Sequence, residues 1–314
     1  MRIVFMGTAP FAVPTLHNLI LAGHDVRLVV TQPDRPAGRG KQLKAPPVKE
    51  LALEFGIECA QPESVRTDAF LNQLSDIGPD VIVVVAYGRI LPEPVLTLPP
   101  LGCINLHGSL LPAYRGAAPV QRAIMAGEPM VGVTTMHMDR TMDTGDIILR
   151  RSVQLVGDED HGQVAEVLSR DGAALMLDTL DQLEWGTAPR IPQDHTQATY
   201  APPLGRDDEM IDWTRPARDL MNQIRGLSPA PGAFTGWRGG KLKLFKTRVI
   251  ESDGGKSGEP GEIVEVGPEG FTVSAGSGRL LVLELQREGK KRGSAADFLM
   301  GSRLAVGERL GAPD

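Results

Sequence analysis

The sequence predicts an α/β domain with a mostly parallel, helix-covered sheet, followed by a small β-barrel. Two observations predict this fold. In the first half, short β-branched runs alternate with segments of helical spacing, and in the last third, short strands are separated by Gly-rich turns. The first pattern is typical of parallel sheets with helices on both faces, and the second favours a small barrel. With 314 residues, the chain is long enough for two separate cores.

The spacing of apolar residues defines the elements of the first half. Residues 80–86 (DVIVVVA) are nearly continuously apolar, as expected of a strand that is covered on both faces. Leu16, Leu19 and Ile20 have helical spacing, and Gly23 ends that helix. We predict strands at 3–6, 26–31, 80–86, 103–106 and 131–138, and helices at 14–22, 47–55, 119–126 and 164–183.

The pattern breaks in residues 189–208, which are polar, contain several prolines and show no period. We predict an inter-domain linker there, between a first domain at 1–188 and a second at 209–314. In the second domain we predict helices at 212–224 and 294–300, and strands at 242–250, 261–266, 270–274 and 280–285.

The composition excludes several classes of protein. Hydrophobic residues make up 41% and charged residues 23%, as in ordinary globular proteins. Without a signal peptide or an 18-residue apolar stretch, we expect a cytoplasmic protein that does not enter membranes. Cys59 and Cys103 form neither a disulfide framework nor a CxxC site, and the six histidines are scattered, so no metal is expected. Cys103 lies in an apolar run and is expected to be buried.

The net charge of −6 weakly opposes a nucleic-acid partner. Phosphate contacts, however, act within about one Debye length, roughly 8–10 Å, so local clusters matter more than the sum. Residues 35–49 and 237–248 each hold five basic side chains and no acidic one, and residues 287–292 hold four basic side chains and one acidic one. Each segment is a candidate for phosphate contact, and a solvated loop is the alternative.

Polar side chains follow two of the predicted strands. Asn105 and His107 share a face because they lie two residues apart in an extended segment, and Asp143 lies in the loop after 131–138. An amide, an imidazole and a carboxylate could stabilise an oxyanion and guide the proton of an attacking amine. From spacing alone, an Asn and a His on one strand are more often structural than catalytic. No nucleophile elbow is present, so a Ser-His-Asp triad is not indicated.

The segment INLHGSLLPAYRGAAPVQRAI, followed by GVTTMHMDRTMDTGDII, resembles the signature of the folate-dependent formyltransferases. The resemblance implies a Rossmann-like catalytic domain and 10-formyltetrahydrofolate as co-substrate, with no metal. It places the catalytic residues at Asn105, His107 and Asp143. It also implies that the folate pocket is lined by Ser109, Leu110, Leu111, Pro112, Arg89, Ile90 and Leu91.

The resemblance also implies a mechanism. A neutral amino group attacks the formyl carbon, Asn105 donates a hydrogen bond to the developing oxyanion, and protonated His107 adds a second, charged donor. The carboxylate of Asp143 orients His107 and helps to take the amine proton through a water.

Two further features bear on the substrate. Residues 31–41 (TQPDRPAGRGK) closely resemble the insertion by which methionyl-tRNA formyltransferases engage the acceptor stem. Arg39 is the candidate for the groove contact, and Arg35 and Lys41 are expected to meet phosphate. A solvated loop is the alternative reading of this segment.

The second feature is the C-terminal domain. Residues 211–213 and 225–234 resemble that family's OB-like tRNA-binding barrel, whose basic strand would present Lys241, Lys243 and Lys246 to phosphate. The resemblance implies formyl transfer to the α-amino group of initiator methionyl-tRNA, in support of translation initiation. No obligate protein partner is evident.

Three other functions remain to be weighed. A nicotinamide-dependent oxidoreductase is disfavoured because the turn after the first strand has one glycine, Gly7, where three are needed, and Pro10 occupies the turn. A non-catalytic tRNA-binding protein would not need Asn105, His107 and Asp143. A formyltransferase acting on an amino sugar nucleotide is chemically the nearest alternative.

Overall fold

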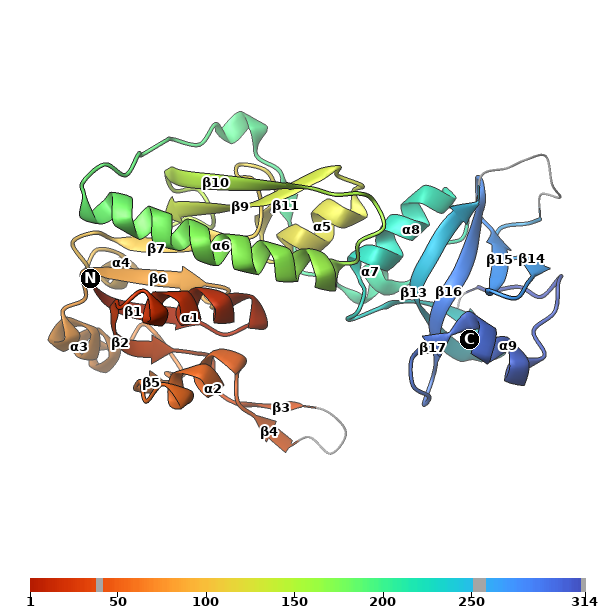
Figure 1. Ribbon diagram of the computed structural model, residues 1–314, viewed down its shortest axis with the longest axis horizontal. Helices are drawn as coiled ribbons and strands as arrows, with labels where there is room; N and C mark the ends of the chain where they lie inside the picture. Colours follow the sequence, from red (N-terminus) through yellow and green to blue (C-terminus); the bar gives the residue numbers. More distant parts are fainter. Residues whose placement is uncertain (38–41, 251–257, 312–314) are drawn as a thin grey trace. The chain divides into compact units, whose positions relative to one another are not determined.

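The computed structural model describes residues 1–37, 42–250 and 258–311 (Figure 1). The chain forms two compact units. The first comprises Met1–Pro119, Met130–Gln154 and Ala165–Pro202, and the second comprises Val120–Pro129, Leu155–Val164 and Pro203–Asp314. The predicted linker at 189–208 is thus divided between them, since its residues up to Pro202 belong to the first unit.

The first unit contains a seven-stranded sheet that confirms the predicted, mostly parallel α/β fold. In spatial order its strands are β10 (Ile147–Gln154), β9 (Met130–His137), β7 (Cys103–His107), β6 (Val81–Val85), β1 (Arg2–Gly7), β2 (Asp25–Val30) and β5 (Cys59–Ala60). The strands from β7 to β5 are parallel. β9 is antiparallel to β7, and β10 is antiparallel to β9. β10 is absent from the prediction, because its Arg150-Arg151-Ser152 core lacks a clear apolar run.

Helices cover both faces of this sheet. On one face, α3 (Asp68–Ile77) and α4 (Glu93–Leu96) pack Phe70, Leu74 and Val95 against side chains of β1, β2 and β6. On the other face, α6 (His161–Glu184) runs across the sheet (Figure 1). There Gly172 lies so close to Leu106 that an added Cβ would be 2.6 Å from its side chain. Other helices of this unit are η1 (Pro10–Ala12), α1 (Val13–Leu21), α2 (Pro47–Glu54) and η2 (His195–Gln197).

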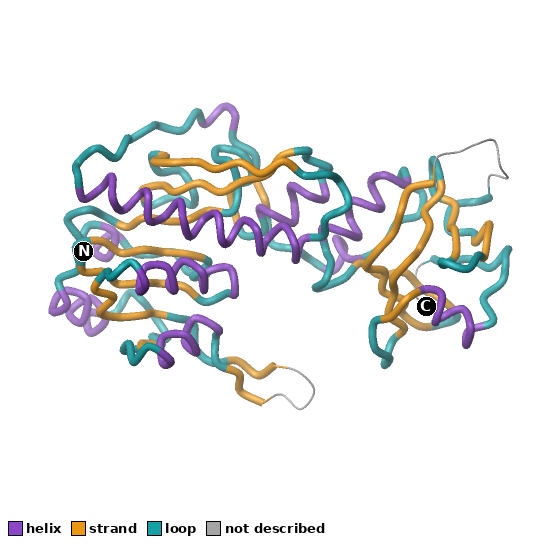
Figure 2. Tube along the Cα trace, viewed as in Figure 1, coloured by secondary structure: helices purple, strands orange, loops and turns teal. Residues whose placement is uncertain are grey.

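Two small sheets lie outside the seven-stranded one (Figure 2). A hairpin is formed by β3 (Arg35–Ala37) and β4 (Gln42–Lys44), within the predicted basic loop. In the other sheet, β8 (Arg115–Gly116) pairs in parallel with β11 (Tyr200–Ala201). The second pairing joins part of the predicted linker to Arg115 and Gly116.

The second unit is an antiparallel β domain, as predicted. Its strands are ordered β12 (Ala233–Trp237), β13 (Gly240–Ile250), β16 (Arg279–Arg287), β15 (Phe271–Ser274) and β14 (Ile263–Val266), and β17 (Gly293–Ser294) pairs with β16. Bridges from Gly311 to Gly236 and from Arg309 to Glu262 join the C-terminal segment to both outer strands of this order. That segment therefore closes the sheet towards a barrel. Helices of this unit are α5 (Pro119–Met125), nearly all of which belongs to it, α7 (Arg206–Glu209), α8 (Ala217–Gly226) and α9 (Ala295–Ser302).

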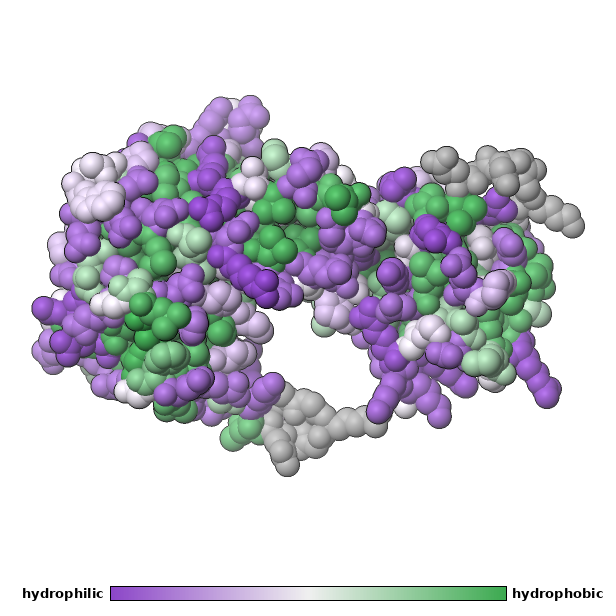
Figure 3. All heavy atoms as spheres, viewed as in Figure 1, coloured by the Kyte–Doolittle hydropathy of each residue, from purple (hydrophilic) through white to green (hydrophobic). Residues whose placement is uncertain are grey.

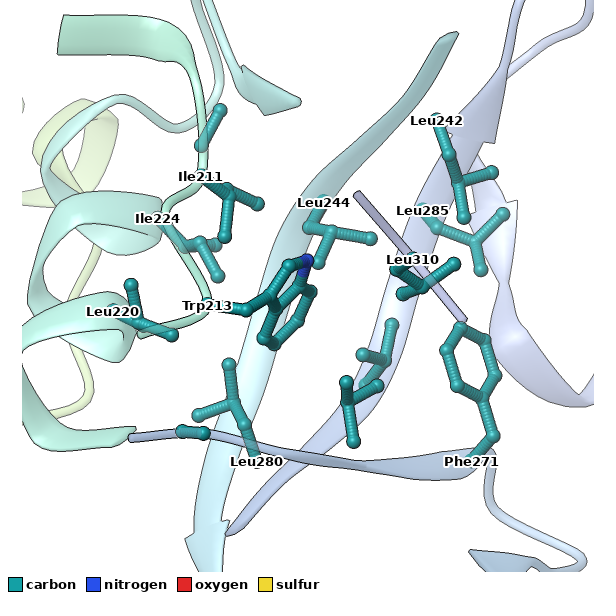
Figure 4. Close-up of a cluster of buried hydrophobic side chains, with 14 of the residues drawn as sticks. Ile211, Trp213, Leu220, Ile224, Leu242, Leu244, Phe271, Leu280, Leu285 and Leu310 are labelled. Carbon is teal, nitrogen blue, oxygen red and sulfur yellow. The ribbon is translucent and has the colours of Figure 1, made fainter. Parts of the chain in front are cut away.

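The core of the second unit explains why α8 begins later than predicted. Figure 4 shows Trp213 between Leu220 and Ile224 of α8 and the strand residues around Leu244. The indole N–H of Trp213 donates to Thr235 Oγ1 at 3.0 Å. Ile211 and Trp213 are buried in this core from a non-helical segment, and the helix begins only after Pro216. Figure 3 shows hydrophilic residues over much of the visible face of each unit, with small hydrophobic areas between them.

Candidate active site

Asn105 and His107 lie on one face of β7, as their spacing predicts. In the ladder, Asn105 is opposite Val84 and Met136, and His107 is opposite Thr134. Asn105 is half-buried, and in the described part of the chain its side-chain amide makes no hydrogen bond to another protein group. This amide is therefore a free donor at the end of a strand, next to a buried imidazole.

The structure brings His107 and Asp143 together. The His107 Nδ1 atom lies 3.7 Å from Asp143 Oδ1, and the two side chains are only 7% and 12% exposed. This separation suits an ion pair but is too long for a direct hydrogen bond. The other ring nitrogen, Nε2, lies 3.0 Å from the carbonyl oxygen of Tyr114, which can only accept a hydrogen bond. Nε2 therefore carries a proton, and Nδ1 faces the carboxylate.

Asp143 reaches His107 by an unexpected route. Because β9 is antiparallel to β7, its end at His137 lies beside Ile104, at the start of β7 rather than at the end that holds His107. The loop after β9 has to turn back to bring Asp143 to the imidazole. In this loop, Asp143 has a φ of 58°, in the left-handed region that is uncommon for residues other than glycine.

A backbone N–H fixes the orientation of the Asp143 carboxylate. The N–H of Gly116 donates to Asp143 Oδ2 at 2.8 Å, which leaves Oδ1 to face His107. Gly116 itself has a φ of +126°, and a Cβ built on it would lie 2.5 Å from the carbonyl oxygen of Ala201. Only glycine fits this position without displacing the backbone.

The residues after β7 that were predicted to line the folate pocket are largely hydrogen-bonded to, or packed against, other protein groups. The Ser109 hydroxyl donates to Ala113 O at 2.6 Å, and Thr134 links the Ser109 carbonyl to the Leu111 N–H. Leu111 is buried beside Met136, and Leu110 packs so closely on Gly132 that an added Cβ would be 2.4 Å away. These contacts shape the turn that leads into Pro112.

The second segment predicted to line the folate pocket consists of residues 89–91, after β6. Its three side chains lie in three different environments. Arg89 donates through Nε to Gln32 Oε1 at 3.1 Å and through Nη1 to the carbonyl of Pro62 at 3.2 Å. Leu91 is buried in the core, whereas Ile90 is 60% exposed. Of these three side chains, Ile90 is the one available to contact an apolar ring.

The basic residues expected to meet RNA also differ in their surroundings. Arg35 is exposed on the hairpin, whereas Arg39 and Lys41 lie outside the described residues. On β13, Lys246 is exposed, but the Lys243 amine donates to the Pro231 carbonyl at 2.6 Å. Lys241 lies over the ring of Phe234, with 4.8 Å between the amine and the ring centroid.

Two other titratable groups lie at the start of β7 and beside it, on β9. Burial raises the pKa of the Cys103 thiol to about 12, so this side chain is a buried apolar group, as predicted, and not a nucleophile. Burial also lowers the pKa of His137 to about 4, and the Arg190 guanidinium adds to this shift. His137 is therefore neutral at physiological pH.

The described residues place no group of three or more His, Cys, Asp or Glu side chains where it could hold a metal ion. Within the same residues, none of the helices has the length and apolar composition needed to cross a bilayer.

Sequence reasoning missed several groups around the carboxylate. The Tyr114 carbonyl and the Gly116 N–H are backbone atoms, which side-chain patterns do not reveal. The glycine in the sequence Tyr114-Arg115-Gly116 was the available signal, because glycine often marks a close backbone approach. Gln193, which contacts the Asp143 loop, lies in the segment predicted to be a linker.

Comparisons with known proteins identify the family to which the two parts of the chain are similar. Residues 1–180 match the formyl transferase family, and residues 203–303 match the formyl transferase C-terminal domain. The methionyl-tRNA formyltransferase of Moorella thermoacetica is 50% identical over 99% of both chains. That of Geobacter sulfurreducens is 49% identical over 99% of this chain and 97% of its own.

Solved structures share the fold at lower identity. HypX from Aquifex aeolicus, in complex with tetrahydrofolic acid, has a TM-score of 0.66 at 17% identity, covering 95% of this chain and 47% of its own. The sugar 3N-formyl transferase WlaRD has a TM-score of 0.67 at 17% identity, covering 93% of this chain and 99% of its own. With both of its parts matched and relatives near 50% identity along nearly its whole length, the chain belongs to the formyl transferase family.

Proposed function

We propose that this protein transfers the formyl group of 10-formyltetrahydrofolate to the α-amino group of initiator methionyl-tRNA, in the cytoplasm. The observation that carries the proposal is the cluster of Asn105, His107 and Asp143 in a chain 50% identical, over 99% of both lengths, to a methionyl-tRNA formyltransferase. The tetrahydrofolic acid in the HypX structure supports a folate as formyl donor.

Asn105 is the group best placed to stabilise the oxyanion that forms on the formyl oxygen. Among the residues that the structure describes, its amide has no hydrogen-bond partner, so it can donate to that oxygen without losing another hydrogen bond. A donor that is already in place costs little reorganisation during the reaction. The exposed side chain of Ile90 offers an apolar contact for the ring system of the folate.

His107 contributes mainly through its charge. Its Nε2–H donates to the Tyr114 carbonyl and its Nδ1 points towards the Asp143 carboxylate, so in this geometry both ring nitrogens are directed at protein oxygens and not at the substrate. When protonated, the imidazole places a positive charge beside the oxyanion in a buried site, where such charges act strongly. Asp143 stabilises that charge and accepts the proton of the attacking amine through a water. The folate nitrogen that carried the formyl group is then protonated, its bond to the formyl carbon breaks, and tetrahydrofolate leaves.

The assay that tests the function is direct. The protein is incubated with 10-formyltetrahydrofolate and either charged initiator tRNA or an amino sugar nucleotide, and the products are identified by mass spectrometry. We expect N-formylmethionine on the tRNA and no formylated sugar. Formylation of the sugar alone would support the alternative substrate, which the sequence relatives do not favour.

Substitution of the catalytic amide gives the first prediction. Asn105→Ala should lower kcat by roughly 10²–10³-fold, which is the usual cost of losing one oxyanion donor. The KM values for folate and tRNA should change little, because the donor acts mainly in the transition state. Steady-state kinetics test this, and a kcat within a few fold of the wild type would refute the role of Asn105.

A further inference from the structure

The side chain of Gln193 joins the catalytic loop to a buried arginine. Its Nε2 amide donates to two backbone carbonyls of the loop, Asp143 O at 2.9 Å and Gly145 O at 2.8 Å. Its Oε1 accepts two hydrogen bonds from Arg115, at 3.1 Å from Nε and 2.6 Å from Nη2. All four contacts lie within the first unit of the chain.

These contacts fix the amide in one orientation. The Arg115 guanidinium is a donor only, so the atom that faces it has to be the amide oxygen. The two loop carbonyls are acceptors only, so the atom that faces them has to be the amide nitrogen. Gln193 and Arg115 are 6% and 3% exposed, respectively, so water cannot readily replace these bonds. Breaking any of them would leave a buried polar group unsatisfied.

The same contacts surround the unusual backbone of Asp143. Its φ of 58° is a costly conformation for a residue other than glycine and has to be held by its surroundings. Gln193 holds the carbonyl of Asp143 from one side, and the backbone after Arg115 holds its carboxylate, through the Gly116 N–H. Both the backbone carbonyl and the side-chain carboxylate of Asp143 are therefore held by one buried network that includes Arg115 and Gln193.

A second contact limits the movement of the loop. Gly145 lies so close to His137 that an added Cβ would be 1.8 Å from the His137 carbonyl oxygen. The Gln193 amide binds the carbonyl of this glycine as well as that of Asp143. The turn from Asp143 to Gly145 is thus clamped between β9 and Gln193.

We propose that Gln193, with Arg115, is a positioning residue that holds the Asp143 carboxylate against His107. This inference rests on the proposed function, since it assigns Gln193 a role in the same reaction. Gln193 acts through Asp143 and does not touch the substrates. Displacing a catalytic group by about 1 Å can cost on the order of 10²-fold in rate.

The test uses the isosteric change Gln193→Glu in the full-length protein. The new carboxylate can still accept from Arg115, but its second oxygen would face the carbonyl oxygens of Asp143 and Gly145 and repel them. We expect kcat to fall by roughly 10–100-fold, with the KM values for folate and tRNA within about two-fold of the wild type. The ¹⁵N shifts of the His107 ring should also change, because the carboxylate beside it moves.

The decisive experiment repeats the change in an Asp143→Asn background. If Gln193 acts through the carboxylate of Asp143, Gln193→Glu should then cost less than about three-fold, because the effects of coupled residues are not additive. An equal loss in both backgrounds would overturn the proposal. So would a kcat for Gln193→Glu within three-fold of the wild type.

Gln223→Glu provides the matched control. Gln223 is 3% exposed and likewise donates to two backbone carbonyls, of Asp208 at 2.8 Å and Met210 at 2.9 Å, but it lies in the second unit. The Gln223→Glu substitution should lower thermal stability but should not lower kcat. If Gln193→Glu does not fold, as judged by circular dichroism, Gln193→Met removes the same bonds without adding charge and has the same expected kinetics.

The two proposals can fail separately. If the wild-type protein forms no formylmethionine, the proposed function fails. If the wild type is active and both Gln193 variants keep its kcat, only the positioning role fails.

Discussion

At the scale of single residues, the site depends on conformations that are rare elsewhere. Asp143 has a positive φ, and Gly116 has a φ that only glycine adopts without strain. Between them runs the hydrogen bond that orients the carboxylate. The position of Asp143 relative to His107 is therefore a property of backbone geometry as much as of side-chain identity.

His137 gives a prediction about acid stability at this scale. Its pKa is about 4 in the folded protein, below the value of 6.5 that applies without burial. Below pH 6.5, the unfolded chain takes up a proton that the folded protein does not, so stability falls as the pH drops from about 6.5 towards 4. His137→Gln removes this contribution. When the pH falls from 7 to 5, the free energy of unfolding should therefore decrease by about 2 kcal/mol less in the variant than in the wild type.

Urea unfolding at several pH values checks this prediction. His24 and His161, whose pKa values are also lowered by burial, are present in both proteins, so their contributions cancel in the comparison. Parallel pH profiles for the variant and the wild type would show that His137 does not carry this proton linkage.

At the scale of elements, the C-terminal segment completes the second unit. After α9, the Leu310 N–H donates to the Gly261 carbonyl, and the Ile263 N–H donates to the Glu308 carbonyl. The Leu310 side chain is 3% exposed and belongs to the apolar core shown in Figure 4. Residues 307–311 therefore stabilise this unit, although the sequence prediction ended its elements at residue 300.

Leu310→Ala tests the role of this segment. Removing a buried leucine side chain typically costs about 2–5 kcal/mol, so the unfolding transition of the second unit should shift to lower urea concentration. The backbone amides of Ile263 and Leu310 should also exchange faster with solvent. Val306→Ala, at a 60% exposed side chain of the same segment, should change neither measurement. A loss below 1 kcal/mol for Leu310→Ala would contradict this role.

At the scale of the whole molecule, an acidic protein has to bind a polyanion under the proposed function. The net charge is −6, so attraction has to come from local basic surfaces. On β13, Lys246 is exposed, while the Lys243 amine is held by the Pro231 carbonyl. The two lysines should therefore contribute unequally to tRNA binding.

The corresponding prediction concerns salt and KM. The tRNA KM should rise with salt, because each phosphate contact releases counterions. Lys246→Gln should raise the tRNA KM more than Lys243→Gln, with kcat unchanged and a shallower dependence on salt. Arg66→Gln, at an exposed site in the first unit, is the control. A salt-independent KM, or equal effects of Lys246→Gln and Arg66→Gln, would contradict phosphate contact by β13.

The sequence by itself determined the features that depend on local periodicity. The apolar run at 81–85 predicts a central strand, and the two-residue spacing places Asn105 and His107 on one face. The resemblance carried by the motifs at 104–124 and 132–148 predicts the family. These properties are encoded within short segments, so they can be recognised before the chain is folded.

Only the tertiary structure decided how distant segments meet. Asp143 reaches His107 although β9 runs antiparallel to β7, and Gln193 contacts the Asp143 loop from a segment that is polar and without period. Likewise, nothing in the spacing of the lysines shows that the Lys243 amine is held by Pro231. Such contacts depend on loop conformation and on pairing between segments far apart in the chain, which local patterns of hydrophobicity do not specify.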